Sequence, residues 1–95
     1  MIQHTVAFRL NPSADGSEFV RRALQLALLD GVEDFEVLRQ VGLKNDFTHA
    51  LSMRFSSQHA YDSYNEDPAH VSFVAEVWTP QVSEFLELDY IAYDD

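Results

Sequence analysis

A tyrosine and a histidine six residues apart are the side chains in this sequence best suited to catalysis. Tyr64 is expected to end one helix, and His70 is expected in the first turn of the next. The partial positive charge at a helix N-terminus disfavours the imidazolium ion, so His70 should be neutral and able to accept a proton. Tyr64 can donate a hydrogen bond to a substrate carbonyl. The pair would support proton abstraction next to a carbonyl, followed by intramolecular aldol closure or isomerisation.

A purely structural role is the competing interpretation of the same two residues. His70 can bond a backbone carbonyl and fix the corner between two helices, with Tyr64 closing the core beside it. The two interpretations differ in what lies in front of the side chains. Catalysis requires both polar tips to converge on an enclosed cavity of at least about 300 Å³, whereas a structural role does not.

Two further histidines lie on the apolar parity of expected strands. His4 alternates with Val6 and Phe8, and His49 alternates with Leu51. A histidine in such a position is either a hydrogen-bonded core residue or part of a pocket. Aromatic side chains can wall a flat apolar ligand. The predicted ligand-pocket residues are His4, His49, Phe73 and Trp78.

Neither a metal nor a cofactor is predicted. The potential ligands His4, His49, His70 and Asp67 show no HxH or HExxH spacing, although residues distant in sequence could still converge. Three glycines leave no room for a glycine-rich phosphate loop, and the absence of cysteine excludes thiolate chemistry. His59 is expected on the surface. The acids of the last strand are interpreted as a solvated face: Glu87, Asp89, Asp94 and Asp95.

Hydrophobic periodicity predicts the elements that position these residues. Strict alternation predicts strands over residues 2–10, 35–43, 49–55 and 85–93. A helix capped by Asp15 and ending at Asp30-Gly31 is predicted from a separate stripe: Phe19, Val20, Ala23, Leu24, Ala27 and Leu28. A second helical region runs from Ser56-Ser57 to Thr79-Pro80 and is broken at Asp67-Pro68, which suits an N-cap followed by the first helical position.

The resulting order, β-α-β-β-α-β, predicts the α+β class and a ferredoxin-like fold. Its four-stranded antiparallel sheet would carry helices on one face. The other face holds too many apolar residues to remain in water. Pairing two such sheets face to face would cover it, so a homodimer is expected. Residues 1–95 are too few for two cores and are predicted to form a single domain.

The net negative charge of the chain excludes some classes of partner. The chain carries a net charge of −10, and its last 48 residues have one basic and nine acidic groups, a net of −8. Such a surface repels phosphate, so neither nucleic acid nor an anionic membrane is an expected partner. The N-terminus lacks the features of a signal peptide, and no apolar run approaches the roughly 18 residues of a membrane span. These features predict a soluble, cytoplasmic protein.

Several segments resemble the stress-responsive α/β-barrel (Dabb) family. They are the opening HTVAFRL at residues 4–10, Thr48-His49, the block YDSYNEDPAHV at 61–71 and the closing FLELDY at 85–90. The resemblance covers nearly the whole chain. It implies a dimeric α+β barrel built from two ferredoxin-like subunits. It does not by itself imply an activity, because many members have no assigned reaction.

One branch of this family, the plant olivetolic acid cyclases, is enzymatic. It uses a tyrosine and a histidine six residues apart in the same block, which the resemblance places at Tyr64 and His70. The histidines on its first and third strands match His4 and His49. This chain has Asp67 where that branch has a histidine before the proline.

Two classes of function therefore remain open, and whether the protein is an enzyme stays undecided. The favoured class is a homodimer without catalysis that binds a small hydrophobic molecule or serves in stress tolerance. The alternative is a cofactor-independent cyclase or isomerase acting on a carbonyl compound such as a polyketide, with His70 as base and Tyr64 as hydrogen-bond donor. A third class, the cofactor-free oxygenases on the same barrel, is supported by the expected fold alone.

Overall fold

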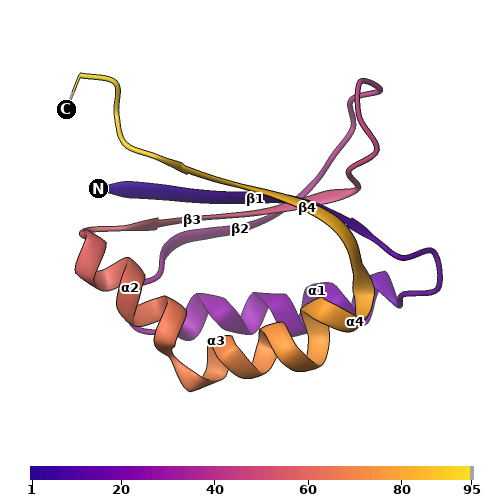
Figure 1. Cartoon of the computed structure of the whole chain (residues 1–95), viewed down its shortest axis with the longest axis horizontal. Coiled ribbons are helices and arrows are strands. Elements are labelled where there is room, and N and C mark those ends of the chain that lie inside the picture. The colour runs from indigo at the N-terminus through magenta and orange to yellow at the C-terminus, as the bar shows by residue number, and fades with distance from the viewer. Residues whose placement is uncertain (95) are drawn as a thin grey trace.

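The strands form an antiparallel sheet in the order β2-β3-β1-β4, with the helices on one face (Figure 1). The computed structural model describes residues 1–94. Within that range the strands are β1 (Ile2–Leu10), β2 (Glu33–Arg39), β3 (His49–Phe55) and β4 (Val82–Tyr90). This arrangement confirms the predicted α+β class and the four-stranded antiparallel sheet of the ferredoxin-like fold.

The helical segments begin where the sequence predicts caps. They are α1 (Gly16–Leu24), the 3₁₀ segment η1 (Gln25–Leu28), α2 (Gln58–Glu66), α3 (Pro68–Phe73), the π-helical turn η2 (Val74–Trp78) and α4 (Thr79–Gln81). Asp15, Ser57 and Asp67 each accept a hydrogen bond from a backbone N–H in the first turn that follows. Each cap satisfies a donor that has no partner inside the helix.

The predicted apolar stripe of the first helix is wrong at its C-terminal end. The chain tightens from α to 3₁₀ geometry after Leu24, so the side chains no longer advance by 3.6 residues per turn. Leu26 is buried as a result, while Leu24 is half-exposed and Leu28 is 84% exposed. Ala27 also faces solvent.

The second helical region continues beyond its predicted end at Thr79-Pro80. The wide turn η2 follows α3 directly, and α4 carries the helix on to Gln81 (Figure 1). Pro80 is tolerated because it lies in the first turn of α4, where its missing N–H has little cost. The turn η2 buries Val77 and leaves Trp78 half-buried beside the sheet.

The strand predicted over residues 35–43 is displaced. Strand β2 begins earlier and ends at Arg39, leaving Val41 84% and Leu43 99% exposed in the following loop. Gln40 explains the early end. Its side chain bonds the backbone N–H of Gly42 and the backbone oxygen of Phe47, so the chain turns away from the sheet there.

Strand β4 also starts earlier than predicted, because its pairing with β1 extends to Val82 opposite Leu10. The register places Glu87 opposite Val6 and Asp89 opposite His4, on the face that the helices cover. Both acids are exposed to solvent, as the sequence predicts, although they share this face of the sheet with His4 and Val6. Asp94 is exposed, and Asp95 lies outside the described residues.

The core lies between the sheet and the helices, where Phe8, Phe19, Phe55 and Met53 are the largest fully buried side chains. The opposite face of the sheet is open. It carries four large apolar residues that are 38–50% exposed: Leu38, Leu86, Leu88 and Tyr90. Along residues 1–94, none of the helices has the length and apolar character needed to cross a membrane.

Candidate functional site

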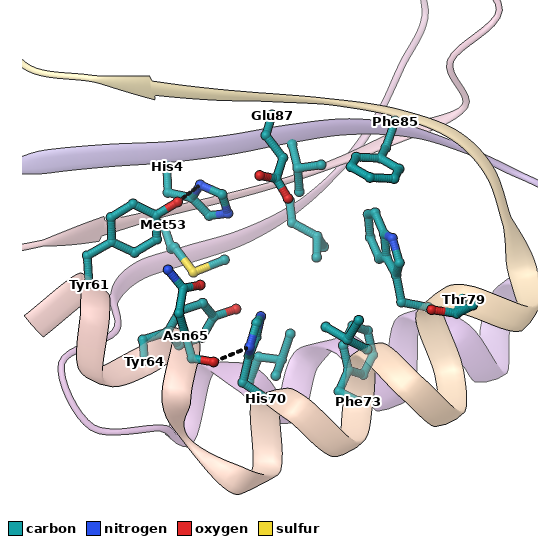
Figure 2. Close-up of a pocket in the computed structure, with 15 residues that line it drawn as sticks. His4, Met53, Tyr61, Tyr64, Asn65, His70, Phe73, Thr79, Phe85 and Glu87 are labelled. Atoms are coloured by element: carbon teal, nitrogen blue, oxygen red, sulfur yellow. Dashed lines mark hydrogen bonds between the residues drawn. The ribbon is translucent and has the colours of Figure 1, made fainter.

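A cavity of about 290 Å³ lies between the sheet and the helical segments α2, α3 and η2 (Figure 2). Its apolar walls include Val6, Leu51, Met53, Phe73, Trp78 and Phe85. Its polar groups include His4, Tyr61, Tyr64, Asn65, His70 and Glu87. Five of the six predicted site residues therefore meet here: Tyr64, His70, His4, Phe73 and Trp78.

His70 presents one ring nitrogen to this cavity. Its Nδ1 lies 3.2 Å from the backbone oxygen of Asn65, which can only accept, so Nδ1 carries the proton. Nε2 is then a lone-pair acceptor and points into the cavity (Figure 2). Burial lowers the pKa of His70, partly offset by the bond to Asn65, which favours the neutral ring at pH 7. One hydrogen bond thus fixes the helix corner and also sets the tautomer of a base.

Tyr64 supplies a hydroxyl that its neighbours do not use. Its ring is 2% exposed and packs against Phe55 and His70, with centroid distances of 5.1 and 4.4 Å. The Tyr64 hydroxyl has no hydrogen-bond partner among residues 1–94. Every fully buried side-chain N or O atom in that range has a partner, so the hydroxyl oxygen is not fully buried and must reach the cavity that Tyr64 lines. Burial and the charge of Glu87 raise the pKa of Tyr64, which keeps it a hydrogen-bond donor.

His4, Tyr61 and Asp89 form a hydrogen-bonded network at one end of the cavity. His4 Nδ1 lies 2.6 Å from Asp89 Oδ1, and Tyr61 Oη lies 3.0 Å from both carboxylate oxygens. Tyr61 Oη is also 2.9 Å from His4 Nδ1. The carboxylate can only accept, so Nδ1 of His4 and the Tyr61 hydroxyl both donate to it. Burial and Asp89 raise the pKa of Tyr61.

Glu87 extends from β4 into the cavity between His4 and Phe85 (Figure 2). Within the described residues it takes part in no ion pair. Its charge contributes to the raised pKa values of Tyr61 and Tyr64, so it acts electrostatically on the opposite wall. Sequence reasoning missed Tyr61, Asp89 and Glu87. The alternation of side chains along the last strand could have indicated two of these residues, because Glu87 and Asp89 lie on the same face as Phe85.

His49 does not share this cavity. It begins β3, where its Nδ1 lies 2.8 Å from Thr48 Oγ1 and its ring stacks on Phe8 at a centroid distance of 5.6 Å. Burial lowers its pKa, with Arg39 adding to the effect. This placement corrects the expectation that His49 belongs with the other pocket residues. Among residues 1–94, no cluster of three or more histidine or carboxylate side chains is arranged to hold a metal ion.

The chain matches one protein family and is similar to solved structures. The family model described as Stress responsive A/B Barrel Domain (Dabb) matches residues 2–92. A solved Dabb family protein with a ferredoxin-like fold from Mesorhizobium loti is 41% identical, with a TM-score of 0.85, 95% of this chain and 94% of that chain being covered. A search of curated proteins gave no match.

Two more distant structures share the fold. Hydroxynitrile lyase from Passiflora edulis is 17% identical with a TM-score of 0.86, covering 99% of this chain and 94% of that chain. A dimeric ferredoxin-like protein of unknown function from Thermobifida fusca is 16% identical with a TM-score of 0.79, covering 94% of this chain and 88% of that one. At these identities the likeness shows the fold alone.

Proposed function

Since the chain belongs to the Dabb stress-responsive A/B barrel family, we propose that it acts as a homodimer that binds a small, largely apolar molecule. The observation that carries this proposal is the cavity between sheet and helices. Its volume of about 290 Å³ is just below that of most ligand pockets, which run from roughly 300 to 1,000 Å³, so it suits only a small molecule. Apolar walls with a few convergent polar tips are typical of such pockets.

The open face of the sheet supports the dimer. Leu86, Leu88 and Tyr90 of β4 lie on it in alternate positions, and Leu38 lies on the opposite edge strand. Monomers rarely leave several large apolar side chains grouped on one face in water. Two sheets packed face to face, about 10 Å apart, would remove it from solvent. The similar Thermobifida fusca protein is described as dimeric.

A cofactor-independent enzyme is the second candidate. His70 Nε2 and the Tyr64 hydroxyl face the same cavity, which favours acid–base chemistry at a carbonyl. Nε2 would take a proton from the carbon beside the carbonyl, while Tyr64 donates a hydrogen bond to the enolate oxygen. In aldol closure, the enolate carbon would attack a second carbonyl of the same molecule, and the resulting alkoxide would take the proton back from the His70 imidazolium. In isomerisation, the imidazolium would return the proton to a different carbon of the conjugated enolate. The similar Passiflora protein, a hydroxynitrile lyase, indicates that this fold can carry an enzyme.

Trp78 offers a direct test of ligand binding, because it is the single tryptophan and lines the cavity. Titration with uncharged probes such as cyclohexanone should change its fluorescence in a saturable way. Val74→Phe should fill the cavity and abolish the change. Val71→Phe on the same helical region is the matched control, since Val71 is 54% exposed and outside the cavity. Equal responses from both variants, or no saturable response, would contradict the proposal.

Hydrogen–deuterium exchange next to the carbonyl of a bound ketone tests the enzyme candidate without a known substrate. In D₂O the protein should accelerate exchange above the buffer rate, measured by proton NMR. His70→Gln should reduce that acceleration by about 10²–10⁴-fold, as expected for loss of a general base. Tyr64→Phe should also reduce it, while His59→Gln, an exposed change on α2, should not. Exchange that survives both site substitutions would eliminate this candidate.

A further inference from the structure

We propose that the cavity selects a protonated amine, with Glu87 binding the ammonium group and the aromatic end binding its apolar body. The inference rests on the proposed function, because it assumes that the cavity takes a small molecule. It goes further by assigning the chemical class of that molecule and the residue that determines it.

The first argument is the unpaired charge of Glu87. Its carboxylate enters the cavity, and no Lys or Arg lines the same space. The arginines described in ion pairs bind Glu18, Asp34, Asp46 and Glu84, all of them outside the cavity. Glu87 is exposed to solvent at the edge of the cavity, so its attraction for a bound cation is partly screened and weakens as salt is added.

The second argument is the balance of donors and acceptors. The Nδ1 protons of His4 and His70 are directed to Asp89 and Asn65, so the neutral form of each ring offers a lone pair at Nε2. Together with Glu87 they make three acceptor groups in the cavity lining. A primary ammonium group has three N–H donors and no acceptor, which matches this set. A carboxylate or phosphate ligand could accept from the Tyr64 hydroxyl, but it would also face these three acceptors and a like charge.

The third argument is the aromatic end of the cavity. Phe85 lies two residues from Glu87 on the same face of β4, and its ring meets that of Trp78 edge-on at 5.7 Å. Figure 2 shows Glu87 between Phe85 and His4. The rings bury hydrocarbon and also attract a cation placed over their faces. The expected ligand is therefore an alkylamine with a compact apolar body.

Three probes of one shape test this proposal: cyclohexylmethylamine, cyclohexylmethanol and cyclohexanecarboxylate. Binding is followed by Trp78 fluorescence at pH 7.5 and low salt. The amine should bind at least tenfold more tightly than the alcohol, and the carboxylate least tightly. Glu87→Gln should lower amine affinity at least tenfold and leave alcohol affinity unchanged. Glu76→Gln removes the same charge outside the cavity and should change amine affinity less than twofold.

The outcomes separate this inference from the function on which it rests. If the alcohol binds but the amine binds no more tightly, or if Glu87→Gln keeps the amine preference, the inference is wrong and cavity binding stands. If none of the three probes binds, the proposed ligand-binding function fails with it. Circular dichroism of each variant establishes that it is folded, and proton NMR of the probes detects binding independently of the tryptophan.

Discussion

The two faces of strand β4 differ in what they contribute to the protein. Phe85, Glu87 and Asp89 point toward the helices and supply an aromatic wall and two carboxylates to the cavity region. Leu86 and Leu88, between them, point to the open face. One strand thus carries the polar groups of the proposed ligand site and the apolar surface of the proposed dimer. Alternation along the strand is sufficient to separate the two roles.

The same contrast extends across the sheet. The covered face holds fully buried rings such as Phe8 and Phe55, which pack against the helices. On the open face, the central strand β1 contributes no large apolar side chain, and the large apolar residues lie on the edge strands. The β1 residues on that face are Gln3, Thr5, Ala7 and Arg9. Stability of the subunit should therefore depend on one face and assembly on the other. Substitutions on each face can test this separation.

The largest effect is expected from a charge on the open face. Leu88→Asp should dissociate the dimer, because each copy loses a buried leucine and gains an unpaired carboxylate. Leu88 is 38% exposed in the subunit, so covering the rest of it is worth about 0.6–1.1 kcal/mol per copy, and the desolvation of an unpaired carboxylate adds a larger cost. Sedimentation should show wild type near twice the 10.9 kDa chain mass and the variant near that mass. Leu28→Asp, exposed on η1, should remain a dimer, and a dimeric Leu88→Asp protein would refute the interface.

The next effect should come from the covered face. Phe55→Ala removes a fully buried ring that stacks on Tyr61, and should lower the free energy of unfolding by about 3–5 kcal/mol. Leu86→Ala on the open face should lower it far less when measured at a concentration where the protein is monomeric. Urea unfolding of both variants measures the difference. Similar losses would show that the two faces are not energetically separate.

A smaller effect should distinguish the two tyrosines of α2. Tyr61→Phe deletes the hydroxyl that bonds both oxygens of Asp89, and should cost about 1–3 kcal/mol of unfolding free energy. Tyr64→Phe deletes a hydroxyl with no partner among residues 1–94, so it should change stability by less than about 0.5 kcal/mol. Urea unfolding tests the pair. A larger loss from Tyr64→Phe would mean that its hydroxyl has a structural role.

The smallest effect is a dependence of stability on pH. Burial lowers the pKa of His70 below its ordinary value of 6.5, so the unfolded chain binds the proton more readily. This contribution is complete above about pH 7 and is lost as pH falls through the lowered pKa, by at most about 1.4 kcal/mol per pH unit. Urea unfolding at pH 7.5 and 5.5 should show a smaller loss for His70→Gln than for wild type. His49, whose pKa is also lowered, accounts for part of the remainder.

His59→Gln is the control for this measurement, because His59 is exposed on α2. It should lose as much stability as wild type between the two pH values. If His70→Gln also behaves like wild type, the neutral form of His70 does not contribute to folding, and the proposed base loses this support.

Local signals were sufficient to predict much of the fold. The alternation of β1 and the caps at Asp15, Ser57 and Asp67 depend on neighbouring residues, and the structure confirms them. The element order then follows from their spacing. The sequence also brought Tyr64 and His70 together, because both lie beside the helix break that the Asp-Pro pair creates.

Interactions between distant segments could not be predicted in the same way. Asp89 contacts His4 only because β4 pairs with β1 in one particular register. The early end of β2 depends on the side chain of Gln40 closing a loop, which periodicity does not report. Glu87 and Asp89 are exposed, as the sequence predicts, but their place beside the cavity depends on the same pairing of β4 with β1.

The π-helical turn η2 has a consequence for sequence alignment. Such a turn holds one residue more than an α-helical turn of the same span, so it is equivalent to a single-residue insertion within Val74–Trp78. An α-helix advances about 100° per residue, and a relative without the insertion would align correctly only if the gap falls inside this turn. A gap placed a few positions away would match Trp78 to a residue on a different side of the helix. An ancestral sequence reconstructed from such an alignment would carry a wrongly inferred residue at the position of Trp78, in the wall of the cavity.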